Sequence, residues 1–272
     1  MTRTTTLGLW SGWQGRGALA LAAVALAGLT AQGQTALRVK GVAGAVGAAG
    51  VPAAIELEAL HGYRGLEFVG QKTFKTRASD KGQWSVLGVT SGVWMFAAHA
   101  PGRLPQVLLL PIQFTQKNPA SATGGQIPWE VAFELMSADA GSPLDRAATA
   151  ALASDRRGAE AALASLAETG TALELTAGGE IALYMRASGL ARALFQRAVA
   201  LAPAQGRAHL GLASAAMMDG AWDDAAKRLW TAREQGVGER LQRALGAAIT
   251  ELQRITRSEG HDIGGASGVP GR

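Results

Sequence analysis

The chain has 272 residues, of which 48% are hydrophobic, 17% are charged and 6% are aromatic. This length allows two modest domains that each bury a core, and the composition is that of ordinary globular proteins. The formal net charge of +5 comes without any concentrated run of Lys and Arg, so no nucleic-acid-binding surface is indicated. The sequence contains no Cys, which excludes disulfides and leaves packing alone to hold the fold.

Residues 1–33 have the pattern of a secretory signal peptide. Arg3 and Arg16 precede an apolar run from Ala18 to Leu29, and Ala31-Gln32-Gly33 then places small residues where signal peptidase requires them. The run is well short of the roughly 20 residues that a transmembrane helix needs, so we expect no permanent membrane span after cleavage. The sequence therefore predicts an exported protein, either periplasmic or secreted.

Alternating hydrophobicity between residues 36 and 135 predicts an antiparallel β-sandwich. Apolar or β-favouring residues alternate in short runs that are separated by polar or Gly-rich turns. The runs are Leu37/Val39, Ile55/Leu57, Phe74/Thr76, Trp84/Val86, Trp94/Phe96/Ala98 and residues 129–135. Asp80-Lys81-Gly82 is typical of a hairpin turn, because Gly accepts positive φ. We interpret Trp84 and Trp94 as core residues, and Glu56 and Glu58 as a solvated strand face.

The order of turn and core residues in this region resembles the carboxypeptidase regulatory-like domain. The resemblance is carried by Val39-Lys40-Gly41, Gly50 to Leu57, Thr76 to Trp84, Leu87-Gly88-Val89, Gly92 and Ala100-Pro101-Gly102. It implies the transthyretin-like sandwich fold for residues 36–135. It implies no catalysis, because in carboxypeptidases the zinc belongs to a separate catalytic domain that nothing in this chain resembles.

Helical pattern begins after a short linker of small and acidic residues, 136–142. Ser142 can cap the first helix, with Pro143 in its first turn. Two Ala-rich helices are expected, from Pro143 to Ser154 and from Arg157 to Ala167. A closing helix is expected where one apolar stripe is formed by Leu241, Leu245, Ala248, Leu252 and Ile255. Residues 258–272 are rich in Gly and Ser and are predicted to be a disordered tail.

Between these helices the chain repeats itself. A shift of 34 residues pairs positions of two second helices, and a shift of 31 pairs positions of two first helices, which indicates that the first unit lacks three residues at its turn. The pairs are Ala191 with Ala225, Phe195 with Leu229, Ile181 with Leu212, and Gly189 with Gly220. This period, with small residues at helix contacts and Pro203 after a second helix, resembles tetratricopeptide repeats. The resemblance implies a helical-repeat array over residues 143–257 with a capping helix at its end.

In tetratricopeptide repeats, the first helix of each unit lines a concave groove that holds partner peptides. The resemblance and helical spacing together assign to this groove Leu183, Arg186, Leu210, Ser214, Met217 and Met218. An adaptable Met surface suits peptide binding, although the filling of gaps between Ala-rich helices explains the same Met residues equally well. Trp222 and Trp230 lie two turns apart on one repeat helix and are interpreted as packing residues.

The sequence indicates no reaction chemistry. The four His residues are far apart and form no metal-ligand pattern, and no nucleophile elbow or phosphate-binding glycine loop is present. We therefore expect a non-enzymatic protein without cofactor or metal. The leading hypothesis is an exported interaction or scaffold protein of the cell envelope that binds a protein or peptide through its helical repeats. Two alternatives stay open: binding of carbohydrate or another surface polymer by the sandwich, with Trp129 or Tyr63 as stacking rings, and a hydrolase without a recognisable motif.

Overall fold

The computed structural model describes residues 37–48, 50–62, 72–112, 125–126 and 130–258. These residues belong to one compact unit, which begins at Ala36. The predicted signal peptide, the predicted tail beyond Ser258, and the two candidate stacking residues Tyr63 and Trp129 lie outside the described residues. Among the helices that are described, none has the length and apolar character needed to cross a bilayer.

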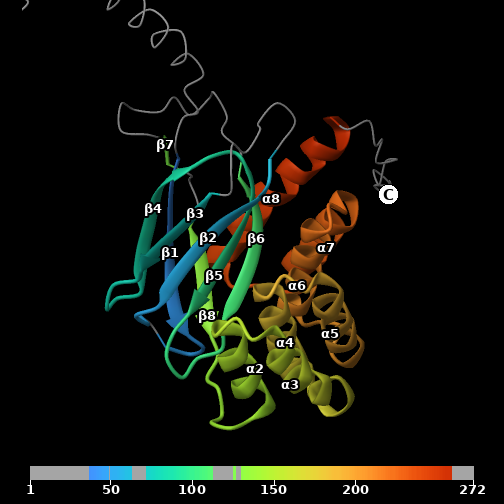
Figure 1. Cartoon of the computed structure of the whole chain (residues 1–272). Helices are drawn as coiled ribbons and strands as arrows, with labels where there is room; N and C mark the ends of the chain where they lie inside the picture. Colours follow the sequence, from blue (N-terminus) through green and yellow to red (C-terminus); the bar gives the residue numbers. More distant parts are fainter. Residues whose placement is uncertain (1–36, 49, 63–71, 113–124, 127–129, 259–272) are drawn as a thin grey trace, which may run out of the picture. The chain divides into compact units, whose positions relative to one another are not determined.

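The described chain begins with eight strands in two sheets (Figure 1). In sheet A, β4 pairs with β1 in antiparallel fashion, and β7 and β8 pair with β1 in parallel, so the prediction of antiparallel strands throughout is wrong for this sheet. Sheet B has the antiparallel order β3-β2-β5-β6. The strands are β1 (Leu37–Ala45), β2 (Ala54–His61), β3 (Thr73–Arg77), β4 (Gln83–Val89), β5 (Gly92–His99), β6 (Gln106–Ile112), β7 (Gly125–Gln126) and β8 (Val131–Leu135).

The two sheets share one hydrophobic core. The ring of Trp84 in β4 lies 6.4 Å, centroid to centroid, from that of Phe96 in β5 and 6.1 Å from that of Phe133 in β8. Gly41 makes room for this indole, because a Cβ at position 41 would lie 2.3 Å from the Trp84 ring. Both Trp84 and Trp94 are buried, which confirms the prediction that they are core residues.

Seven helices follow in the described chain, so the predicted order of a β region and then helices is confirmed. Ser142 accepts a hydrogen bond from the Asp145 N–H and caps the first helix, as the sequence predicts. The apolar stripe expected on the last helix is buried along its whole length. The helices are α2 (Pro143–Leu152), α3 (Arg156–Thr169), α4 (Ala172–Tyr184), α5 (Ser188–Leu201), α6 (Gly206–Met218), α7 (Trp222–Glu234) and α8 (Glu239–Ser258).

Three helix pairs, α2/α3, α4/α5 and α6/α7, turn in the same way. Ser154, Arg186 and Gly220 follow the first helix of each pair with φ of 62°, 58° and 73°. In every turn this residue's N–H bonds to the carbonyl three residues back, and the next N–H bonds to the carbonyl five residues back. Arg186 is therefore the counterpart of Gly220. The predicted pairing of Gly189 with Gly220 and the three-residue deletion are wrong, because a Gly was assumed to mark a turn that Arg186 forms instead.

The helices cover the outer face of sheet B at β6, whereas the outward residues of β3, at the other edge of the sheet, are exposed. Contacts to β6 come from α4, α6 and α8, while α5 and α7 lie further from the sheet (Figure 1). The hydroxyl of Ser214 in α6 accepts a hydrogen bond of 3.2 Å from the Leu109 N–H in β6. Every residue of β6 is buried as a result. Because an edge strand needs partners for its backbone groups, α6 also closes one edge of sheet B.

The prediction that Glu56 and Glu58 form a solvated face is wrong, because residues at the end of α4 bind both acids. Glu58 is buried and forms an ion pair with Arg186. Glu56 accepts hydrogen bonds from Lys75 Nζ at 2.8 Å and from the Tyr184 hydroxyl at 3.5 Å. These two acids therefore attach the end of α4 to sheet B.

Candidate functional site

The six residues predicted to bind a partner lie where the inner helices meet the sheet. Four of them are buried: Leu183, Leu210, Ser214 and Met217. Arg186 pairs with Glu58, and the carbonyl of Met218 lies 3.3 Å from Nε2 of His61. The inner faces of α4 and α6 are thus packed against the chain's own sheet in this conformation.

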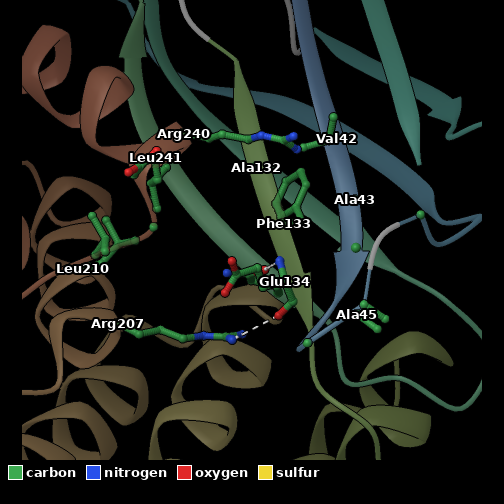
Figure 2. A pocket seen from close by; sticks show the side chains of 18 of the residues that line it. Val42, Ala43, Ala45, Ala132, Phe133, Glu134, Arg207, Leu210, Arg240 and Leu241 are labelled. Carbon is green, nitrogen blue, oxygen red and sulfur yellow. Dashed lines mark hydrogen bonds between the residues drawn. The ribbon is translucent and has the colours of Figure 1, made fainter. Parts of the chain in front are cut away.

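A cavity of ≈ 780 Å³ opens where the edge of sheet A meets α6 and α8 (Figure 2). Its walls come from the ends of β1 and β8, Gln106 of β6, Arg207 and Leu210 of α6, the loop 236–238 and the first turn of α8. A cavity of this size is in the usual range for ligand sites. Leu210 is the one residue that both lines this cavity and was assigned to the groove from the sequence.

The elements around the cavity converge on Glu134 of β8. Its N–H donates to Gln106 Oε1 at 2.7 Å, and its carbonyl accepts from Arg207 Nη1 at 3.0 Å (Figure 2). Its carboxylate lies beside the loop before α8, since a Cβ on Gly238 would be 3.5 Å from Oε1 of Glu134. The negative charge is therefore close to the start of α8, where the helix dipole favours it.

The guanidinium of Arg207 binds the buried carboxylate of Glu180. Its Nε and Nη2 donate to Glu180 Oε1 and Oε2 at 2.7 and 2.6 Å, the bidentate geometry that suits this pair. Burial raises the pKa of Glu180, and the charge of Arg207 opposes that rise. Burial would lower the pKa of Arg207, but Glu180 and Glu134 hold it above its usual value. With Nε, Nη1 and Nη2 all engaged, Arg207 fixes the position of β8.

Other charges at the cavity have no such partner. Lys81 and Arg240 are exposed and form no ion pair or hydrogen bond with any residue that the structure describes. Figure 2 shows the Arg240 side chain extending from the start of α8 past Ala132 toward Val42. Glu239 lies in the first turn of α8, where a negative charge suits the helix dipole. The cavity thus combines a backbone edge held by Gln106 and Arg207 with exposed cationic side chains.

The chemistry available at the cavity is that of hydrogen bonding and charge. Its described lining includes Lys, Arg, Glu and Gln side chains and a large share of Gly and Ala; no His, Ser, Thr or Tyr is among these described residues. Across the described ranges, no group of three or more His, Asp or Glu could hold a metal ion. Compared with known proteins, the chain matches no family model and no curated protein.

A second polar cluster lies between β2, β3, β5 and α4, around Glu56. Its carboxylate is 4.0 Å from His99 Nε2, besides its contacts with Lys75 and Tyr184. Burial is the main cause that lowers the pKa of His99. Burial and the nearby charge of Glu56 raise the pKa of Tyr184 to about 12. All of these groups already bind one another, so the cluster joins helix to sheet.

The two Trp residues of α7 differ. Trp222 is half-buried and meets His61 edge-on at 5.3 Å between ring centroids. Trp230 is 51% exposed, so the prediction that it packs against neighbouring helices is wrong. Its indole lies under Arg233 at 5.8 Å and donates to Glu234 at 2.8 Å, both on its own helix.

Sequence reasoning did not identify Glu134, Arg207 or Arg240 as site residues. One signal was available, because Glu180 stands alone in the apolar stretch from Leu175 to Leu183. A charge that is buried in a helix needs a partner of opposite charge. A search for that partner among nearby Arg residues leads to Arg207, and from there to the edge of β8.

Proposed function

We propose that this chain is an exported, non-enzymatic interaction protein of the cell envelope, which holds a segment of a partner protein in the cavity beside Glu134. Export rests on the signal pattern of residues 1–33. The observation that carries the binding proposal is the wall of the cavity, where the small residues Gly238 and Ala132 leave the main chain uncovered by large side chains. Small residues allow another backbone to approach closely, and main-chain groups are what a bound peptide requires.

The proposed architecture is a transthyretin-like sandwich joined to a degenerate array of tetratricopeptide-like repeats. The shared core around Trp84 supports the first part. The identical turns at Ser154, Arg186 and Gly220, spaced by 32 and 34 residues, support the second. In this arrangement the concave face of the array holds the sandwich, and the cavity replaces an open groove as the place for a partner.

Carbohydrate binding by the sheets has less support. Trp84 and Trp94 are buried, so neither ring is available to stack on a sugar. Phe133 borders the cavity but is 1% exposed, because its ring belongs to the core between the sheets. Within the described residues, the cavity therefore offers no aromatic platform.

A bulky side chain at Ala132 tests the proposal. Ala132 lines the cavity, whereas Ser85 is exposed on the same sheet outside it. We expect Ala132→Trp to abolish binding of the full chain to an array of random linear heptapeptides, while Ser85→Trp binds like the unaltered chain. Equal thermal unfolding of the two variants excludes misfolding as the cause. Retained binding by Ala132→Trp, or no peptide bound by the unaltered chain, would contradict the proposal.

A further inference from the structure

The outer edge of β8 has one residue with unused main-chain groups at the cavity. The Leu135 carbonyl accepts from the Val46 N–H, so the backbone groups of Leu135 point toward β1. Because backbone direction alternates along a strand, those of Ala132 and Glu134 point to the opposite side. Gln106 and Arg207 take both groups of Glu134. The N–H and C=O of Ala132 have no hydrogen-bond partner in the described part of the chain, and Ala132 lines the cavity.

These two groups define what a ligand must present. One N–H and one C=O of a single residue are what a strand offers to the next strand. A ligand that satisfies both needs an acceptor and a donor at main-chain spacing, which a peptide residue supplies. Since Gln106 and Arg207 close the edge at Glu134, such pairing is confined to a short stretch around Ala132.

The charged side chain that extends along this stretch is a cation. Arg240 extends past Ala132 and has no ion pair among the described residues (Figure 2). The nearest acid on the strand, Glu134, directs its carboxylate to the loop at Gly238, before α8. A free guanidinium binds a carboxylate through two parallel hydrogen bonds. The lining also includes Lys81, a second cation without an ion pair in the described ranges, and the acid Glu239 in the first turn of α8.

We propose that the cavity takes a short, extended and acidic peptide segment. One residue of the segment bonds to the N–H and C=O of Ala132, and an Asp or Glu side chain of the segment binds Arg240. This inference rests on the proposed function and names the chemical class of its partner. It also assigns Arg240 as the residue that determines specificity.

The test uses the full chain and heptapeptides with amidated C-termini, each compared with the same peptide ending in a free carboxylate. We expect peptides with Asp or Glu to bind about tenfold more tightly than the same peptides with Asn or Gln. N-methylation of one peptide residue, which removes its N–H, should abolish binding at a single position of the segment. Arg240→Gln should remove the acidic preference, whereas Arg243→Gln, exposed on the same helix and outside the lining, should keep it.

Three outcomes overturn the inference: equal affinity for acidic and amide peptides, an acidic preference that persists in Arg240→Gln, or binding that requires a free C-terminal carboxylate. Failure of the proposed function is recognised separately. If peptides of every charge bind and Ala132→Trp abolishes that binding, the cavity is the site and only the acidic assignment is wrong. If no peptide binds, both proposals fail.

Discussion

Sheets A and B share a core but differ on their outer faces. On sheet A the outward residues Arg38, Ser85 and Leu87 are exposed, whereas on sheet B every residue of β6 is buried. The difference comes from α4, α6 and α8, which pack on β6. The sequences of the strands differ in the same way, since β4 alternates in hydrophobicity while β6 is apolar from Val107 to Ile112. A continuous run of this kind is typical of a strand that is covered on both sides.

The largest loss of stability is expected at the contact that joins the helices to sheet A. Glu180 is buried and pairs with Arg207, which in turn holds the β8 backbone at Glu134. Glu180→Ala should lower the free energy of unfolding by about 4 kcal/mol, because it leaves a buried guanidinium without its carboxylate. Urea denaturation measures this change. Glu160→Ala, which breaks the exposed pair with Arg156, is the control and should cost less than about 0.5 kcal/mol.

Truncation of one Leu on each sheet measures the difference between their outer faces. Leu108 in β6 pairs with Phe96 in β5, which faces the core. Because side chains alternate along a strand, Leu109 faces the helices. We expect Leu109→Ala to cost about 3 kcal/mol of unfolding free energy, because it leaves a cavity under α6. Leu87→Ala, at a residue 49% exposed on sheet A, should stay within about 0.5 kcal/mol. Similar losses for the two variants would mean that the helices do not pack on sheet B.

The helix turns provide a smaller and more specific test of the attachment to sheet B. Ser154 and Arg186 both take the left-handed conformation that favours Gly, but only Arg186 pairs with an acid on the sheet. Ser154→Gly should raise the unfolding free energy by up to about 1 kcal/mol by relieving backbone strain. Arg186→Gly should give no gain, because loss of the Glu58 pair offsets the same relief. Equal gains in thermal stability would show that the Arg186–Glu58 pair contributes nothing.

The smallest expected effect on stability comes from the ionisation of Tyr184, on the helix-facing side of sheet B. In a Tyr63→Phe variant, Tyr184 is the only tyrosine left, and its phenol should ionise with a pKa of about 12. Because the folded pKa is raised, the stabilising contribution is complete below pH 10, the ordinary value, and is lost as the pH rises from about 10 to about 12. Ultraviolet absorbance measures the ionisation. A midpoint near 10 would contradict the burial of the Tyr184 phenol beside Glu56.

Much of the fold could be predicted from local pattern. Alternation identified the strands that contain Ile55, Trp84 and Trp94, and the cap at Ser142 marked the first helix after the sheets. The packing of helices on sheet B could not be predicted in this way, because strand alternation identifies only the face that points to the core between the sheets. The positive φ of Arg186 was missed because Gly is the usual residue for that conformation, and the pair with Glu58 that accompanies it joins distant parts of the chain.

The candidate site could be predicted less well, for a physical reason. Helical spacing places Leu183, Ser214 and Met217 on inner helix faces, but spacing does not say what fills the space in front of them. That space is filled by β6, which precedes these helices in the chain and meets them only in the folded molecule. The cavity depends on the same long-range arrangement, because its walls come from strands and helices far apart in sequence.

The parallel pairing of β1 with β8 has a consequence for the order of folding. Gly41 pairs with Val131 across most of the β region, whereas each helix hairpin closes within a few residues. Joining distant strands costs more chain entropy than closing a local turn, and it slows the folding step that depends on it. We therefore expect the hairpins to form early and sheet A to be completed late. Until then the edge of β1 is open to other chains, and concentrated refolding should favour aggregates that dilution prevents.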